Sequence, residues 1–253
     1  MQAAVGITKH MGGLDATRAL WAQCHVEDAR DVLDVGCGIG VGPAHIARRY
    51  GCRVVGLDRS ERMLAWARRR VRHERVEHLV ELRTGVVLAL PFEDDRFDVV
   101  LCESVLAFVE DKPAAIRECV RVTKPGGYVG LNEGLWLTEP PPDLVERLRG
   151  AIGPSVPTEA AWRTLWADSG LTERTIEIRR VDARTEIRSR LQWIGWRWIL
   201  GAWRRALWLY LTNPAMRQSI KQQLDVPLAV FDHTGYGLFT GRKAVPDDRD
   251  NPV

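Results

Sequence analysis

VLDVGCGIG at residues 32–40 is the stretch that decides the fold, because a short apolar strand segment runs directly into glycines at alternate positions. The residues that follow favour a helix as far as Tyr50. Glycines in such a strand–turn–helix unit let the backbone turn tightly and let a ligand approach the peptide planes. The sequence therefore predicts a ligand site at the carboxyl end of this strand.

The same alternation of strands and helices continues on both sides of this unit. A helix is predicted over residues 14–24, and a turn is predicted at KPGG, residues 124–127. Further strands and helices are predicted at 53–57, 61–71, 79–83, 97–102, 114–122 and 128–132. Val- and Leu-rich strands separated by helices are typical of a parallel sheet covered on both faces. With right-handed crossovers, these elements predict a doubly wound α/β sheet.

Composition narrows the class of protein. The 253 residues carry 36 Lys and Arg against 33 Asp and Glu, a balance that does not favour a nucleic-acid partner. The cysteines form no CxxC pair, which indicates reduced thiols rather than disulfides or a metal site: Cys24, Cys37, Cys52, Cys102 and Cys119. The N-terminal residues show no export signal, and no charge-free apolar run reaches about 18 residues. We therefore expect a cytoplasmic protein without a bound metal.

Two carboxylates distinguish the glycine turn from a dinucleotide-binding turn. Asp58 ends the next predicted strand, where a carboxylate can accept hydrogen bonds from both hydroxyls of a ribose. Asp34 precedes the glycines, where it repels a pyrophosphate but suits an ammonium group. The spacing is GxGxG at Gly36, Gly38 and Gly40 rather than GxGxxG, which disfavours a dehydrogenase. A tight turn in a generic nucleotide-binding fold is the alternative, and it leaves both carboxylates without a role.

Residues 32–40 resemble the glycine motif of the class I S-adenosylmethionine-dependent methyltransferase superfamily. The resemblance runs to residue 132 through Asp58, LPF at 90–92, FDVV at 97–100 and KPGG at 124–127. In its sequence motifs the chain is most similar to small-molecule methyltransferases of the quinone-biosynthesis type. It implies a Rossmann-like, mostly parallel seven-stranded sheet, S-adenosyl-L-methionine as cofactor and a small-molecule substrate.

The region after residue 132 is expected to complete the same domain. Helices are predicted over 143–152, 159–169, 183–213 and 214–224, and strands over 175–181 and 236–243. We expect residues 1–245 to form a single methyltransferase domain, followed by a disordered tail at 246–253. Its parts are an N-terminal arm and helix (1–30), a cofactor-binding core (31–133) and a helical cap inserted before the last strand (183–234).

The resemblance also implies which residues hold the cofactor. Those at the methionine end are Asp34, Gly36, Cys37, Gly38 and Gly40; Asp58 holds the ribose; and those beside the adenine are Arg59, Met63, Val86 and Val87. The superfamily commonly has an acidic residue where this chain has Val86. The adenine contact there is therefore expected through the backbone or is missing.

Two residues are candidates for a general base. Glu103 lies at the carboxyl end of the fourth predicted strand, and we favour a cofactor contact over catalysis for it. His10 lies in a glycine-containing arm that can fold over the cofactor as a lid; a solvent-exposed or hinge histidine is the alternative. A base adds about 10²–10⁴-fold for a hydroxyl or an acidic carbon, whereas a stronger nucleophile needs only positioning.

The tryptophan-rich helix has an apolar stripe with arginines beside it. The stripe residues and their flanking arginines are Trp193, Trp196, Leu200, Trp203, Leu207 and Tyr210, with Arg190, Arg197 and Arg204. We favour a buried cap helix; a substrate roof, a peripheral contact with an anionic membrane and a homodimer interface are the alternatives. A substrate that enters beneath such a cap is expected to be apolar or aromatic.

Other functions are distinguished by specific features. A non-catalytic S-adenosylmethionine-binding regulatory protein would have the same turn, so this function remains an alternative. A methyltransferase that acts at a lipid or membrane surface is a second alternative. A nucleic-acid methyltransferase is disfavoured, because ESVL at 103–106 replaces the expected Asn/Asp-Pro-Pro-aromatic motif and no cysteine follows a proline.

Overall fold

The strand predicted at the glycine motif is β1 (Asp31–Val35), and it lies at the centre of the sheet. It pairs in parallel with β2 (Arg53–Asp58) on one side and with β4 (Phe97–Glu103) on the other. All five β1 residues are buried, because neighbouring strands and helices cover both its edges and its faces. The computed structural model describes residues 11–152, 156–181, 196–214, 217–218 and 230–246.

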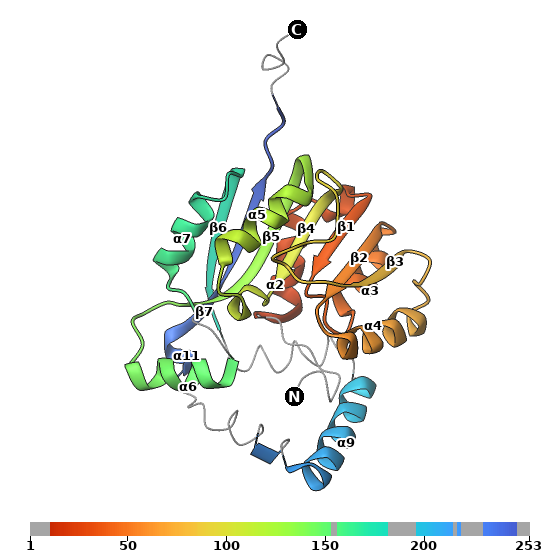
Figure 1. The fold of residues 1–253 in the computed structure, drawn as a ribbon, viewed down its shortest axis with the longest axis vertical. Coiled ribbons are helices and arrows are strands. Elements are labelled where there is room, and N and C mark those ends of the chain that lie inside the picture. The colour runs from red at the N-terminus through yellow and green to blue at the C-terminus, as the bar shows by residue number, and fades with distance from the viewer. Residues whose placement is uncertain (1–10, 153–155, 182–195, 215–216, 219–229, 247–253) are drawn as a thin grey trace.

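The sheet has seven strands in the order β3-β2-β1-β4-β5-β7-β6 (Figure 1). Besides the central three, these are β3 (Val80–Thr84), β5 (Thr123–Trp136), β6 (Thr172–Arg180) and β7 (Thr234–Arg242). Strand β7 runs antiparallel to both of its neighbours, and the other pairings are parallel. The doubly wound fold is thus confirmed. Strand order reverses between β1 and β4, so the switch point that binds ligands in such folds lies at their carboxyl ends.

Helices cover both faces of this sheet (Figure 1). Helices α2 (Gly13–Gln23), α3 (Val41–Tyr50) and α4 (Glu61–His73) pack on one face, and α5 (Lys112–Val122) and α7 (Glu159–Ala167) pack on the other. Strand side chains alternate between these two layers: Val32 and Leu101 face the first, whereas Leu33 and Val100 face the second. A ligand therefore has access at the edge of the sheet and not on its faces.

Several helices begin where the sequence supplies a capping side chain. Ser60, Asp111 and Thr158 each accept a hydrogen bond from the backbone N–H three residues later, which satisfies a donor that the helix itself leaves unpaired. Helix α3 ends at Gly51, whose φ of 72° lies in the left-handed region. These local signals explain why the predicted helix boundaries lie close to the observed ones.

Three further α-helices in the described part of the chain lie beyond the carboxyl ends of the parallel strands, at the bottom of Figure 1. They are α6 (Pro142–Ile152), α9 (Trp196–Thr212) and α11 (Val230–His233). Since α9 and α11 precede β7, helical structure is inserted before the last strand, as predicted. Residues 182–195 and 219–229 of the predicted cap, and the tail from 247, lie outside the described residues. Within the described ranges, no helix is both long enough and apolar enough for a membrane crossing.

The prediction of a turn at residues 124–127 is wrong. These residues belong to β5, and Gly126 and Gly127 exchange backbone hydrogen bonds of 2.8 Å with Lys243, directly after β7. Gly126 has a φ of 78°, and the pairing between β4 and β5 shifts register here. The positive φ therefore produces an irregularity in a continuing strand rather than a chain reversal.

The interpretation of the tryptophan-rich helix as buried is wrong for the side chains that the structure describes. Leu200, Trp203, Leu207 and Tyr210 are 55%, 70%, 61% and 41% exposed. On the opposite side of α9, Arg205 contacts Trp66 of α4 and Ala202 is fully buried. Trp193 and Arg190 lie outside the described residues.

Candidate functional site

The glycine turn between β1 and α3 is held in a conformation that other residues rarely adopt. Gly36, Gly38 and Gly40 have φ angles of 75°, 55° and 75°, all in the left-handed region. The backbone N–H groups of Gly36 and Cys37 both donate to the carbonyl oxygen of Leu57, at 2.7 and 2.9 Å. The end of β2 thus anchors the turn against the carboxyl end of β1.

The space around the turn also requires glycine. A Cβ on Gly36 would lie 2.2 Å from Cγ2 of Val105, and a Cβ on Gly40 would lie 2.8 Å from the Cβ of Ala67. The turn is therefore packed between the segment after β4 and helix α4. It lies at the switch point of the sheet, where such folds bind their ligands; Gly36 is half-buried there, and Gly38 and Gly40 are buried.

Asp58 connects this turn to the end of β2. Its Oδ2 accepts from the backbone N–H of Gly38 at 2.9 Å, and its Oδ1 accepts from that of Ser60 at 2.8 Å. Burial raises the pKa of Asp58, although the two hydrogen bonds and the nearby Arg59 oppose this shift. Each carboxylate oxygen keeps acceptor capacity for a further donor, such as a ribose hydroxyl.

Asp34 lies on the same side of the sheet as α3. Only 6% of it is exposed, and its Oδ2 stands 2.6 Å from the place that a Cβ on Gly42 would occupy. The carboxylate therefore lies against the first turn of α3, where the helix dipole stabilises a negative charge. Burial raises the pKa of the Cys37 thiol well above its usual range, and Asp34 and Asp58 raise it further. Cys37 is thus a neutral thiol within the turn.

The residues predicted beside the adenine lie next to the end of β2. The backbone N–H of Gly85 donates to the carbonyl oxygen of Asp58 at 3.2 Å, which places the segment after β3 beside the ribose candidate. Val86 is 49% exposed, whereas Val87 is buried in the core and offers a ligand only its backbone. Met63 is half-buried and Arg59 is exposed.

A further contact at this end involves two residues that sequence reasoning missed. The Thr84 hydroxyl donates to Oε1 of Glu61, which joins the first turn of α4 to the end of β3. Nothing in the local pattern predicts this pair, because its partners are brought together only when β2 and β3 align.

Glu103 is buried and bound to residues of two other elements. Its Oε2 accepts from the Thr17 hydroxyl at 2.7 Å and from Nδ2 of Asn132 at 3.1 Å. The same Asn132 nitrogen donates to the carbonyl oxygen of Met11 at 2.9 Å. These contacts hold α2 over the carboxyl ends of β4 and β5. Sequence reasoning missed Thr17 and Asn132. His10, the other candidate base, lies outside the described residues, so its role stays a prediction.

Glu133, which follows Asn132 on β5, faces the opposite side of the sheet and was also missed. It is fully buried, and its Oε1 accepts from the backbone N–H groups of Val105 and Leu106, both at 2.8 Å. Its Oε2 is buried without a hydrogen-bond partner among the described residues. Burial raises its pKa to about 7, while the backbone donors and Lys112 act in the other direction. Glu133 thus holds the segment whose Val105 packs against the glycine turn.

The raised pKa of Glu133 predicts a pH-dependent stability. The folded protein favours the neutral carboxyl, so its contribution is complete below pH 4.5 and is lost as the pH rises through about 7. Between about pH 5 and pH 8, Glu133→Gln should gain in free energy of unfolding relative to the wild type, on the order of 3 kcal/mol. Urea unfolding at several pH values measures this difference. The substitution also changes the free energy of unfolding by an amount that does not vary with pH, and this amount does not affect the comparison.

Glu118→Gln is the matched control for this measurement. Hydrogen bonding to Arg121 lowers the pKa of Glu118, so its titration lies below the same pH interval. The stability of this variant should therefore run parallel to that of the wild type between about pH 5 and pH 8. Parallel curves for Glu133→Gln as well would show that Glu133 is not buried as described.

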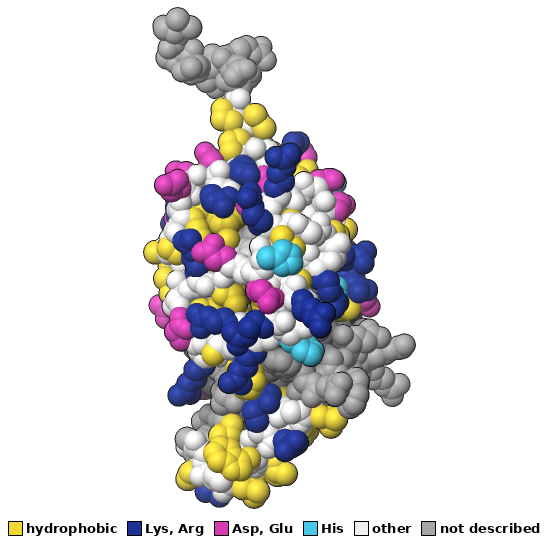
Figure 2. Space-filling model, turned by 90° about the vertical axis from the view of Figure 1, so that its right-hand side faces the viewer, with side chains coloured by type: hydrophobic (Ala, Val, Ile, Leu, Met, Phe, Trp, Pro, Cys, Tyr) yellow, Lys and Arg dark blue, Asp and Glu magenta, His cyan; other side chains and the backbone are white. Residues whose placement is uncertain are grey.

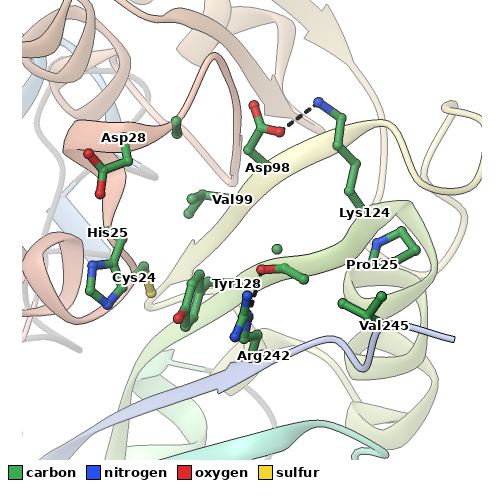
Figure 3. A pocket seen from close by; sticks show the side chains of 13 residues that line it. Cys24, His25, Asp28, Asp98, Val99, Lys124, Pro125, Tyr128, Arg242 and Val245 are labelled. Atoms are coloured by element: carbon green, nitrogen blue, oxygen red, sulfur yellow. Dashed lines mark hydrogen bonds and ion pairs between the residues drawn. The ribbon is translucent and has the colours of Figure 1, made fainter. Parts of the chain in front are cut away.

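A separate cavity of about 540 Å³ lies at the opposite, amino edge of the parallel strands (Figure 3). Three of the charged side chains that line it already have partners: Lys124 contacts Asp98 at 2.6 Å, and Arg242 Nε donates to the Gly126 carbonyl oxygen at 2.9 Å. Because the cavity lies at the amino ends of the parallel strands, it is remote from the glycine turn. We place the candidate site at the carboxyl edge.

Comparison with known proteins identifies a methyltransferase domain in the chain. Residues 33–131, which contain the glycine turn, Asp58 and Glu103, match the family described as a methyltransferase domain. The chain is 31% identical over 163 residues to an uncharacterised protein of Haemophilus influenzae, covering 63% of this chain and 65% of that protein. It is 36% identical over 117 residues to methyltransferase GfsG of Streptomyces halstedii, covering 46% of this chain and 42% of that protein. The chain thus spans less than two thirds of either relative.

A solved structure shares the fold over nearly the whole chain. The cyclase SpnF aligns with a TM-score of 0.74 and 21% identity, covering 95% of this chain and 88% of that one. A likeness at this identity concerns the arrangement of strands and helices and not the reaction. Residues 33–131 thus match a methyltransferase domain, and the chain has the same fold as this solved structure.

Proposed function

We propose that this protein transfers a methyl group from S-adenosyl-L-methionine to a small, apolar or aromatic molecule. The observation that carries this proposal is the left-handed glycine turn, which hydrogen bonds to Leu57 and Asp58 fix at the switch point of the sheet. Two carboxylates flank a bare backbone there, an arrangement that fits a nucleoside joined to a cationic amino acid. The name of GfsG as a methyltransferase supports the same reaction class.

Each part of the cofactor has matching groups in this site. We assign the ribose hydroxyls to Asp58, whose two oxygens keep acceptor capacity. The glycine turn would hold the methionine end, and the negative charge of Asp34 would pair with its ammonium group. The exposed Val86 and the half-buried Met63 supply apolar surface for the adenine, and Arg59 lies at its outer side.

The chain contributes mainly by positioning and by excluding water. The cofactor, when bound, supplies a methyl group on a positively charged sulfur. Holding an acceptor in line with that group can contribute about 7–11 kcal/mol without a base. Glu103, bonded to Thr17 and Asn132, holds α2 at the strand ends, and this contact favours positioning over proton transfer. A base role for His10 stays a prediction.

Calorimetry followed by a transfer assay tests the proposal. We expect S-adenosyl-L-methionine and its demethylated product to bind and NAD to give no heat. Label from the methyl group of the donor should then pass to apolar or aromatic metabolites and not to DNA. Donor binding without transfer to any acceptor would instead favour the regulatory protein, and NAD binding without donor binding would contradict the assigned site.

The same transfer assay distinguishes a substrate in solution from a substrate in a membrane. Transfer to a soluble apolar acceptor supports a metabolite methyltransferase, whereas transfer only to lipids in vesicles supports a lipid or membrane-surface methyltransferase. A peripheral membrane contact through α9 is a separate proposal that needs no methyl donor.

A further inference from the structure

Helix α9 presents an apolar face to solvent. Leu200, Trp203, Leu207 and Leu211 are spaced three and four residues apart and are 55%, 70%, 61% and 66% exposed. Trp208 lies beside this stripe and is 63% exposed. A contiguous patch of large apolar side chains on a protein surface marks a contact with another molecule or with lipid.

The opposite side of α9 is held by the body of the protein. The guanidinium of Arg205 lies 4.3 Å from the centre of the Trp66 ring on α4, and the guanidinium of Arg69 lies 5.0 Å from the same centre. Ala202 is fully buried on this side of the helix. Because Arg205 contacts α4 from the side of the helix opposite the stripe, the apolar stripe is directed away from α4.

Among the residues that the structure describes, the charges on α9 and on the face of α4 that carries Trp66 are of one sign. Helix α9 contains no acidic residue, and its exposed Arg204 lies within the stripe, four residues after Leu200 and three before Leu207. On α4, Arg62 and Arg69 share a helical face with Trp66. Among the described residues, Arg62 has no acidic partner. Figure 2 shows hydrophobic and basic side chains together at the lower end of the molecule, where α9 lies.

We propose that α9 docks this protein on an anionic phospholipid surface. Trp203, Leu207 and Trp208 enter the boundary between headgroups and acyl chains, and the arginines contact the phosphates. This combination of tryptophan, leucine and arginine on a helix without acidic residues is typical of helices that lie in the membrane interface. A second copy of the chain fits less well, because pairing α9 with itself brings arginines together.

Co-sedimentation of the full chain with vesicles tests this proposal without any methyl donor. The protein should sediment with vesicles of phosphatidylcholine mixed with phosphatidylglycerol, and much less with phosphatidylcholine alone. The double variant Trp203→Ser/Trp208→Ser should lower the partition coefficient by about tenfold or more. Arg204→Gln should weaken binding and reduce its dependence on salt.

Two variants on other surfaces are the matched controls. Val245→Ser removes an equally exposed apolar side chain near the C-terminal end of β7, and Arg163→Gln removes an exposed arginine on α7. Neither should change vesicle binding. Circular dichroism shows that each variant is folded.

Three results would overturn the proposal. The first is that wild-type protein stays in the supernatant with both vesicle types. The second is a dimer, seen by sedimentation equilibrium, that Trp203→Ser/Trp208→Ser dissociates, since a second copy would then cover the face. The third is unchanged vesicle binding in this variant together with reduced turnover of a soluble acceptor, which would make α9 a substrate roof. The first two results are measured without a methyl donor and do not depend on the methyltransferase proposal; in the third, unchanged vesicle binding alone already overturns the docking proposal.

Discussion

Replacing Gly36 with alanine is expected to weaken binding of the methyl donor by at least about 30-fold. The φ of 75° at this position costs an alanine about 1–2 kcal/mol. The new Cβ would also lie 2.2 Å from Cγ2 of Val105, and relieving such overpacking costs about 1–3 kcal/mol more. The turn must therefore move away from the end of β2, and its backbone no longer matches the ligand. Calorimetry with the demethylated product measures the loss.

Gly51→Ala is the matched control for this variant. Gly51 has almost the same φ, 72°, but an added Cβ there meets nothing within 4 Å. The control therefore shares the backbone strain without the clash. It should lose about 1 kcal/mol of stability and bind the donor as the wild type does.

The double variant Gly36→Ala/Val105→Ala separates the two causes at the turn. Removing the Val105 methyl groups relieves the clash and leaves the strained φ, so part of the donor affinity should return. If Gly36→Ala alone binds normally, or if the double variant recovers nothing, the packing of Val105 against the turn does not control the site.

Asp58→Asn should lower donor affinity by about 100-fold, with a smaller effect on the rate of transfer at saturating donor. The carboxylate accepts from two backbone N–H groups and, in the proposed complex, from two ribose hydroxyls. An asparagine has one acceptor oxygen, so its NH₂ faces a donor at either Gly38 or Ser60. Hydrogen bonds to a charged group contribute about 1.5–3 kcal/mol each, which corresponds to this loss. Calorimetry and kinetics at several donor concentrations distinguish affinity from rate.

Asp98→Asn provides a control with similar local chemistry at the other edge of the sheet. Asp98 also accepts from two backbone N–H groups, those of Arg30 and Asp31, at 2.9 and 2.8 Å. It pairs with Lys124 in addition, and this pairing and the hydrogen bonds lower its pKa in spite of burial. Asp98→Asn should therefore destabilise the fold and leave donor affinity unchanged. A loss of donor affinity in Asp98→Asn, with normal binding in Asp58→Asn, would contradict the assigned site and place it at the amino edge of the parallel strands.

The sequence alone was sufficient to predict the class of fold, and it indicated where to look for a site in that fold. Local patterns of a few residues predict the apolar strands, the helices and their capping residues. The glycine turn follows β1 directly in the sequence. Asp34 and Asp58 were recognised because each lies at the end of a predicted parallel strand. The carboxyl ends of parallel strands meet at one edge, so order along the chain was enough to bring these residues together.

The tertiary structure alone decided how distant residues complete this site. Glu133 looked like any polar residue at a strand end until Val105 and Leu106 folded onto it, and Glu103 became a partner of Thr17 through the packing of α2. The 124–127 segment extends a strand because β7, more than a hundred residues later, pairs with it. Periodicity identified an apolar stripe on α9 but not whether anything covers it. The physical reason is the same in each case: local sequence sets the direction and amphipathicity of an element, whereas burial, charge and strain depend on which elements become its neighbours.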